Sequence, residues 1–286
     1  MISVIVVNYK NPIFTRHCLD SLKQTHYKDK EVLLIDNSYH NIGLAAAQNR
    51  GALLAKGEYL FFLNNDTIVA PNIFDRLLES KEDIVGCRML DYTGHKELDS
   101  ALSVDKFGFP AGKTGQMFYP DGAIFIKKSV FDEIGGFDEK LFLYGEDRDL
   151  LWRCHLAGYS VGYNPSAVFF HNSKCVNSTN YYRRKITERN IIRSMLKNYS
   201  LKNLPFILTE YAFWSILELM LVLFTHPKAL WKSYLPAYWW NIVNLKDTIK
   251  QRKKVIRRVK DKDLPFSKVI SKFHTLKTKG IPRWIR

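Results

Sequence analysis

The chain of 286 residues contains only four cysteines, and no two of them form a Cys-x-x-Cys pair: Cys18, Cys87, Cys154 and Cys175. A disulfide framework or a structural zinc site needs closer or repeated spacing, so reduced thiols are expected instead. Internal repeats and low-complexity tracts are also absent from the sequence. The opening MISVIVVNYK has neither a basic segment before its apolar run nor a cleavage site. It therefore predicts a first β-strand, and the N-terminal part is expected in the cytoplasm.

Acidic residues are scarce in one part of the chain only. Residues 1–170 carry 18 Lys and Arg against 22 Asp and Glu, whereas residues 171–286 carry 25 against 6. The net charge thus changes from −4 to +19. Because 46% of the residues are hydrophobic, the chain is expected to bury a substantial core. The change in charge predicts a domain over residues 1–175 and a basic, aromatic-rich extension over residues 176–286.

Short apolar runs alternate with helical patterns in the first part of the chain. Strands are predicted over residues 2–7, 32–35, 59–63, 123–126 and 167–170, and helices over residues 12–24, 44–55, 129–134 and 147–157. This alternation predicts an α/β fold with a mostly parallel sheet flanked by helices. Residues 91–117 are polar and contain glycine, so they predict an irregular excursion near the functional edge of the sheet.

The basic second part combines helical patterns with aromatic and apolar residues. Residues 181–198 predict a basic helix, and residues 205–224 are strongly apolar but include Glu210 and Glu218, which are costly at the centre of a bilayer. Together with a basic amphipathic pattern over residues 246–262, this favours helices lying on an anionic membrane surface. A helical dimerisation face and a membrane span remain alternatives. Nucleic acid is not an expected partner, because no recognisable nucleic-acid-binding module is present.

Polar side chains follow the first three predicted strands at the points where these strands end. Asn8 and Tyr9 follow the first strand, Asp36 ends the second, and Asn65 and Asp66 follow the third. Ligands of open α/β sheets bind at the carboxyl ends of the strands. Asp36 is therefore a candidate acceptor for a nucleobase or ribose, with Asn8 and Tyr9 beside the base. Asp66 is placed to hold Mg²⁺ or Mn²⁺ against a diphosphate.

A second candidate region surrounds the predicted helix at residues 44–55. Gly43 precedes this helix, and Asn49 and Arg50 lie within it. Glycine allows a backbone to approach a phosphate near a helix N-terminus, and arginine offsets phosphate charge. Glycine and asparagine also serve ordinary caps and turns, so both interpretations stay open.

Acidic residues gather at the start of the predicted helix at residues 147–157. Glu146, Asp147 and Asp149 suit a helix N-terminus for electrostatic reasons alone. Three carboxylates within four positions repel one another, however, and one that faces a cleft is a candidate general base. His171 follows the last predicted strand, where it is either a metal ligand or a core residue.

The order and spacing of these segments resemble glycosyltransferase family 2, whose members have the GT-A fold. The resemblance runs from Ser3 to about Ser173. It is carried by SVIVVNYKN, LLIDNS, NIGLAAAQNRG, GEYLFFLNNDT and the stretch from DGAIFIKKSVFDEIGGFDEK to YNPSAVFFH. Within the family, the chain most resembles the bacterial rhamnosyltransferase-like branch that assembles O-antigen and other cell-surface polysaccharides.

The resemblance implies a nucleotide-binding half over residues 1–90 and an acceptor half over residues 91–175. The implied donor is a nucleotide-diphosphate sugar, and the implied acceptor is a glycan or a lipid-linked glycan. Asn8, Tyr9 and Asp36 would contact the nucleoside.

The family's motifs also assign catalytic and metal-binding roles. Asp66 matches the metal-binding Asp of the DxD motif, although this chain has Asn64 in place of the first Asp. Asp147 matches the catalytic base within an acidic motif shared with Glu146. His171 matches a histidine that completes the metal shell in some members.

The implied reaction is a single in-line displacement that inverts the anomeric configuration, with Asp147 removing the proton of the acceptor hydroxyl. The alternative is a non-catalytic nucleotide-sugar-binding or scaffolding protein at the membrane surface. The intact acidic cluster favours the enzyme. A nucleotide-release assay separates the two interpretations.

Overall fold

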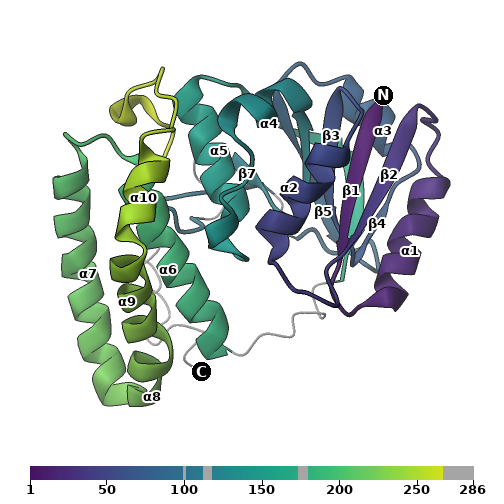
Figure 1. Ribbon diagram of the computed structural model, residues 1–286. Helices are drawn as coiled ribbons and strands as arrows, with labels where there is room; N and C mark the ends of the chain where they lie inside the picture. Colours follow the sequence, from purple (N-terminus) through teal and green to yellow (C-terminus); the bar gives the residue numbers. More distant parts are fainter. Residues whose placement is uncertain (99–100, 112–117, 173–179, 267–286) are drawn as a thin grey trace. The chain divides into compact units, whose positions relative to one another are not determined.

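The computed structural model describes residues 1–98, 101–111, 118–172 and 180–266 (Figure 1). The chain forms two compact units. One unit comprises Met1–Leu102 and Phe118–Val176, and the other comprises Ser103–Met117 and Asn177–Arg286. Residues 103–111 were expected in the first domain, over residues 1–175, but they cluster with the second unit.

In the part of the chain that the structure describes, the first unit contains a seven-stranded mixed sheet of order β2-β1-β3-β8-β5-β9-β4. In this order the strands are Lys30–Asp36, Ile2–Asn8, Tyr59–Asn64, Ala123–Lys127, Ile84–Asp91, Val161–His171 and Thr67–Val69. The pairs β1/β2, β1/β3 and β5/β9 are parallel. The pairs β3/β8, β5/β8 and β4/β9 are antiparallel. A second, two-stranded sheet pairs β6 (Ala101–Ser103) with β7 (Phe118–Pro120).

The strands follow the apolar runs of the sequence. In β1, Ile2, Val4, Ile5 and Val6 are fully buried, as expected of a strand covered on both faces. The β2 strand lies at the edge of the sheet, and its Val32 is 38% exposed. The predicted strands therefore form, and their burial depends on their position in the sheet.

Helices cover both faces of the sheet, because successive side chains of a strand point to opposite faces. Helices α1 (Pro12–Lys23) and α3 (Ile73–Leu78) share one core with Val4 and Phe61. Helix α2 (Leu44–Leu54) lies on the face of Ile5, since a Cβ at Gly51 would be 2.5 Å from Ile5 Cγ2.

Helices α4 (Lys128–Ile134) and α5 (Glu146–Ala157) contact each other in the first unit. Phe131 of α4 contacts Phe62 with ring centroids 5.0 Å apart. Helix α5 ends at Gly158 in the left-handed conformation, as the sequence predicts. Cys18, Cys87 and Cys154 are buried free thiols, and Cys175 lies outside the described residues.

The second unit is helical. It contains α6 (Asn180–Asn198), α7 (Leu204–Thr225), α8 (Pro227–Ala229), a π-helical turn (Leu230–Tyr234), α9 (Leu235–Val243) and α10 (Leu245–Arg252). Residues 103–111 join this unit through Phe107, whose ring packs edge-on against Tyr211, and through an ion pair between Lys106 and Glu210. Among the described residues, α7 is the one helix long and apolar enough to cross a membrane, with a mean hydropathy of 1.7.

The basic amphipathic pattern over residues 246–262 does not form one continuous helix. Helix α10 ends at Arg252, and a short 3₁₀ helix follows at Asp261–Asp263. The guanidinium groups of Arg252 and Arg257 donate hydrogen bonds to backbone carbonyls at the end of α6. These bonds turn the chain back against α6, since they satisfy helix-terminal carbonyls that have no partner within the helix.

Candidate active site

The parallel strands β1, β2 and β3 bring three polar strand ends to one edge of the sheet. Asn8 pairs with Asp36 in the register of β1 and β2, and Val7 pairs with Asn64 in that of β1 and β3. Because the carboxyl ends of parallel strands meet at the same edge, Asp66, two residues after the end of β3, lies on the same side of the sheet as Asn8 and Asp36.

The antiparallel strand β8 adds a further carboxylate to this edge. Asp121 and Gly122 directly precede β8, which starts opposite the end of β3. The backbone N–H of Asn64 donates a 3.0 Å hydrogen bond to the carbonyl of Gly122. Strand β9 ends at His171 on the same edge, because it runs parallel to β5 and β5 runs antiparallel to β8. Asp121 and His171 therefore join Asp66.

Asn8 and Asp36 form a hydrogen-bonded pair at the nucleoside end of the predicted site. Asn8 Nδ2 donates to Asp36 Oδ1 and to Ser38 Oγ, both at 3.2 Å. The Ser38 N–H also donates to Asp36 Oδ1 at 3.0 Å. Hydrogen bonds from Ser38, with a further one from Asn8, hold the pKa of Asp36 below its ordinary value. Asp36 is therefore an ionised acceptor, and Tyr9 beside it is 47% exposed.

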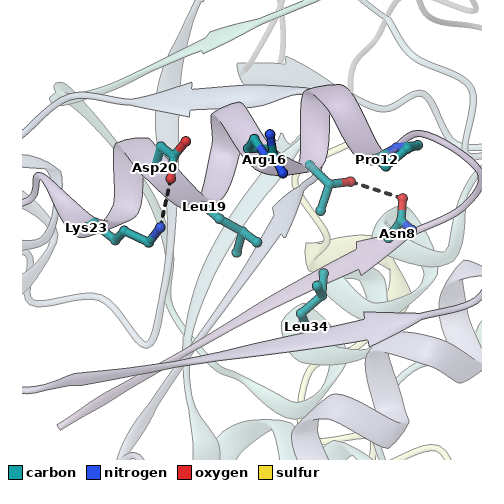
Figure 2. Close-up of a pocket in the computed structure, with 8 residues that line it drawn as sticks. Asn8, Pro12, Arg16, Leu19, Asp20, Lys23 and Leu34 are labelled. Carbon is teal, nitrogen blue, oxygen red and sulfur yellow. Dashed lines mark hydrogen bonds and ion pairs between the residues drawn. The ribbon is translucent and has the colours of Figure 1, made fainter.

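An open groove begins at Asn8 and follows α1 (Figure 2). Leu19 of the helix and Leu34 of β2 line it from its two sides, and the ion pair of Asp20 with Lys23 lies farther along the helix. Asn8 Oδ1 accepts a 3.0 Å hydrogen bond from Thr15, which also lines this groove. Asn8, which is predicted to contact the nucleoside, thus lies at one end of a groove that is lined by charged and apolar residues.

Asp66 and His171 lie side by side. Asp66 Oδ1 is 3.3 Å from His171 Nε2, and their side chains are 16% and 17% exposed. Burial opposes protonation of His171, but the hydrogen bond and charge of Asp66, with the charge of Asp121, outweigh it and raise the pKa of His171. Backbone pairing fixes the two residues, since Thr67 pairs with His171 across β4 and β9.

These two residues suit a divalent cation whose other ligands are supplied by substrate and water. Within the described ranges, no group of three or more His, Cys, Asp or Glu side chains is arranged to hold a metal ion. Mg²⁺ typically binds one or two carboxylates and completes its shell with phosphate oxygens and water. One carboxylate and one imidazole, Asp66 and His171, meet this requirement. Asn65, which is expected to bind the nucleotide, donates from its Nδ2 to Thr15 Oγ1 at 2.8 Å.

The acidic start of α5 supplies a carboxylate with raised pKa. Gly145 precedes the helix with a φ of +105°, and Glu146 is 7% exposed with one carboxylate oxygen, Oε2, buried without a hydrogen-bond partner among the described residues. Burial raises the pKa of Glu146, as do the charges of Asp147 and Asp121. Burial also raises the pKa of Asp147, with Arg148 opposing and Asp121 adding to the shift. Asp121 therefore interacts with both this pair and His171.

Asp149, the third member of the acidic cluster, has a structural role. It is fully buried and accepts a 2.9 Å hydrogen bond from Arg153 Nε. Arg153 also donates to the carbonyls of Ile134 and Gly136. The pair therefore fixes α5 to the turn that follows α4.

Gly43 and Asn49 contact the segment that connects α4 to α5, at Phe142 and Phe137. Gly43 has a φ of +92°, and a Cβ there would be 2.5 Å from Phe142 Cδ2. Asn49 Nδ2 donates to the carbonyl of Phe137, and the Phe137 N–H donates back to Asn49 Oδ1, both at 2.9 Å. Arg50 is exposed on α2. The described contacts do not link these three residues to Asp66 or to α5.

Asp121 was absent from the sequence-based candidates. The sequence feature that could have indicated it is an Asp-Gly pair directly before a buried apolar strand. Asp66 has the corresponding position after a buried apolar strand. Gly122 has a φ of +76°, and a Cβ there would contact Phe169 at 3.3 Å. Because residue 122 is a glycine, the backbone can pack closely against the ring of Phe169 where β8 begins. Asp121 then lies at the edge of the sheet.

The mixed sheet, the helices on both of its faces and the acidic edge define a GT-A fold. Residues 37–135 match the model described as "Glycosyl transferase family 2". Over these residues the chain is similar to glycosyltransferase family 2.

Two curated relatives come from bacteria. The O-antigen biosynthesis protein RfbC of Myxococcus xanthus is 27% identical over 207 residues, which cover 56% of this chain. The N-acetylglucosaminyl-diphospho-decaprenol L-rhamnosyltransferase of Mycobacterium tuberculosis is 43% identical over 49 residues, which cover 17% of this chain. In each case the match spans 16% of the relative's length.

Two solved structures share the fold at low identity. GalNAc-T7, solved with UDP, GalNAc and Mn²⁺, has a TM-score of 0.56 at 17% identity and covers 69% of this chain and 48% of its own. The mannosyltransferase PcManGT of Pyrobaculum calidifontis, solved with GDP-Man and Mn²⁺, has a TM-score of 0.51 at 14% identity. It covers 89% of this chain and 84% of its own.

Proposed function

We propose that the chain is an inverting glycosyltransferase that moves a sugar from a nucleotide-diphosphate sugar to an acceptor hydroxyl in cell-surface polysaccharide biosynthesis. The observation that carries this proposal is the meeting of a metal-competent pair, Asp66 and His171, with Asp121 and the buried start of α5 at one edge of the sheet. The match of residues 37–135 to the family model supports it.

The nucleoside is proposed to bind at Asn8, Tyr9 and Asp36. Asp36 is ionised and lies at a strand end, so it is suited to accept hydrogen bonds from ribose hydroxyls or a base N–H. Tyr9 is exposed beside it and offers an aromatic face to the base. Arg50 is the proposed partner for phosphate charge, because its side chain is exposed in the second half of α2.

Mg²⁺ or Mn²⁺ is the proposed cofactor, held by Asp66 and His171. When bound, such an ion neutralises negative charge on the diphosphate leaving group. Both structural neighbours were solved with Mn²⁺ together with a nucleotide or nucleotide sugar, which supports the same type of cofactor here.

Asp147 is the proposed catalytic base. Burial raises the pKa of both Glu146 and Asp147. Asp147 is the more accessible member of the pair, because its side chain is 19% exposed whereas Glu146 is buried. Asp147 takes the proton of the acceptor hydroxyl while that oxygen bonds to the anomeric carbon. The bond from this carbon to the diphosphate oxygen breaks, and its electron pair leaves with the nucleotide diphosphate. One displacement inverts the anomeric configuration.

The proposed acceptor is a glycan or a lipid-linked glycan, and rhamnose is the first sugar to test. One relative is named as a rhamnosyltransferase that acts on a decaprenol-linked substrate, and another as an O-antigen biosynthesis protein. We further propose a cytoplasmic enzyme that associates peripherally with the anionic inner face of the cell membrane through its basic helical unit.

A binding and turnover screen tests the proposal. The chain is titrated with dTDP-, UDP- and GDP-sugars in the presence of Mn²⁺, and nucleotide release is then followed with polyprenyl-linked glycan acceptors. We expect one donor class to bind and to release nucleotide only when acceptor is added. Binding without acceptor-dependent release would favour the non-catalytic alternative, and absence of binding to all three classes would contradict the proposal.

A further inference from the structure

The acidic side chains of the helical unit face its own basic residues. All six Asp and Glu residues after position 170 lie within the described ranges. Five form ion pairs at N–O distances of 2.6 to 3.7 Å: Glu188 and Glu218 with Arg184, Glu210 with Lys106, Asp247 with Arg193, and Asp261 with Arg257. Positive charge remains in large excess, because residues 171–286 contain 25 Lys and Arg against six Asp and Glu.

The centre of this arrangement is Arg184. Its guanidinium group is 2.6 Å from Glu218 and 3.0 Å from Glu188, and it lies over the ring of Tyr234 at 5.0 Å. The Tyr234 hydroxyl donates to Glu218 at 2.7 Å, and the Tyr211 hydroxyl donates to Glu188. Buried charges are tolerated when they are paired and hydrogen-bonded. Glu218, in the middle of α7, is thus paired with Arg184 and Tyr234 of the same unit.

Helix α7 turns its polar side inward and its apolar side outward. Tyr211, Ser215, Glu218 and Val222 form its buried seam. Its exposed large apolar residues are 36% to 85% accessible: Phe206, Phe213, Ile216, Leu217, Met220, Leu223 and Phe224. A helix at a protein–water surface has the opposite arrangement, and soluble monomers rarely expose apolar patches of this extent.

A second apolar stripe runs from the π-helical turn to α10. Its exposed members recur at helical spacing: Trp231, Leu235, Trp239, Ile242 and Ile249. Exposed lysines lie at both ends of this stripe: Lys228, Lys232, Lys246 and Lys250. Tryptophan and lysine favour the headgroup layer of a bilayer, where aromatic rings meet the acyl boundary and ammonium groups meet lipid phosphates.

We propose that the outward face of α7 and the Trp231–Ile249 stripe insert into the acyl boundary of an anionic bilayer, with their helices lying along the membrane plane. Exposed Lys202 precedes α7, and Lys228 and Lys232 follow it, so an in-plane helix keeps both basic ends among the headgroups. A second copy of this chain is a poorer partner, because its own surface here is basic. This inference deepens the membrane part of the proposed function, and its test needs neither sugar donor nor turnover.

Vesicle flotation of the full chain tests this surface. Vesicles of phosphatidylcholine alone are compared with vesicles that also contain phosphatidylglycerol. Phe224→Asp is the test variant, and Leu53→Asp on α2 is its matched control, because both side chains are 85% exposed and both variants are expected to fold. Phe224→Asp should weaken binding to the anionic vesicles about tenfold or more, since it places a charge at the acyl boundary. Leu53→Asp should leave binding unchanged.

Equal binding of the two variants, or equal binding to neutral and anionic vesicles, would overturn the proposal. Tryptophan quenching by lipids brominated at different depths of the acyl chain then reports the orientation of the helices. Shallow bromines should quench most strongly. Strong quenching at the bilayer centre together with resistance to alkaline extraction would indicate a span instead. A dimer that Phe224→Asp dissociates, without vesicle binding, would identify the surface as a contact between copies.

Discussion

The carbonyl oxygen of Phe142 accepts a 2.6 Å hydrogen bond from the N–H of Leu44, the first residue of α2. Phe142 adopts a φ of +65° and a ψ of −59°, and the N–H of Leu143 donates to the carbonyl of Leu141 at 2.7 Å. This is a γ-turn with positive φ, a strained conformation that is rare in proteins. The turn thus points the carbonyl of Phe142 at the N-terminus of α2. Phe142 itself lies four residues before Glu146, the first residue of the acidic pair that starts α5.

Gly43→Ala should destabilise the chain by about 3 kcal/mol, because it combines positive-φ strain with a clash against the ring of Phe142. Gly135→Ala is the matched control, since Gly135 has a φ of +80° but no atom within 4 Å of its would-be Cβ. It should lose about 1 kcal/mol, from φ strain alone. Urea denaturation measures both losses. Equal losses would show that the packing of Phe142 against Gly43 contributes nothing to stability.

Asp147→Asn should lower kcat by roughly 10³-fold or more while the affinity for the nucleotide sugar stays nearly unchanged, because it removes the proposed base. Asp149→Asn should behave differently, since it weakens a buried ion pair with Arg153 and should cost about 3 kcal/mol of stability. Steady-state kinetics, donor titration and thermal melting separate the two effects. A normal rate for Asp147→Asn would remove this residue from the mechanism.

The sequence predicts the elements that depend on local pattern. The apolar runs of β1 and β3 locate the centre of the sheet, and Gly158 marks the end of α5. The GT-A resemblance adds the roles of Asp66 and Asp147, whose surroundings only the coordinates display. Strand β5, Ile84–Asp91, was not predicted, because its glycine, cysteine and arginine interrupt a simple apolar run.

The features that sequence analysis missed depend on contacts between residues far apart in the chain. The ring of Phe107 meets that of Tyr211 across about a hundred positions, so no local pattern assigns residues 103–111 to the helical unit. The close approach of Phe142 to Gly43 was also not apparent from the sequence, and the prediction that Gly43 lies near a phosphate stays a prediction. The inward orientation of Glu218 follows from Arg184 and was likewise invisible in the composition of α7.

The rate of transfer should rise with pH through a range above the ordinary pKa of an aspartate. Burial and the charge of Asp121 raise the pKa of Asp147. A base acts only when it is ionised, so on acidification activity should be lost at a higher pH than with an exposed carboxylate as the base. Asp121→Asn removes one raising charge and should move the acid limb of kcat/KM to lower pH. Asp132→Asn, on the exposed face of α4, should leave the profile unmoved. A limb that does not shift in Asp121→Asn would mean that Asp147 is not the titrating group.

Excess chelator should abolish transfer, and Mg²⁺ or Mn²⁺ should restore it. Asp66→Asn should weaken Mn²⁺ binding in the presence of nucleotide diphosphate more than His171→Gln does, because hard cations favour carboxylate oxygen over a neutral donor. Manganese titration followed by electron paramagnetic resonance measures binding independently of turnover, and Asp132→Asn again serves as the control variant. Both site variants should retain the fold, since Asp66 and His171 are each partly exposed at the edge of the sheet. Full activity in chelator, with Mn²⁺ affinity unaffected by Asp66→Asn, would exclude the assignment of this pair as the metal site.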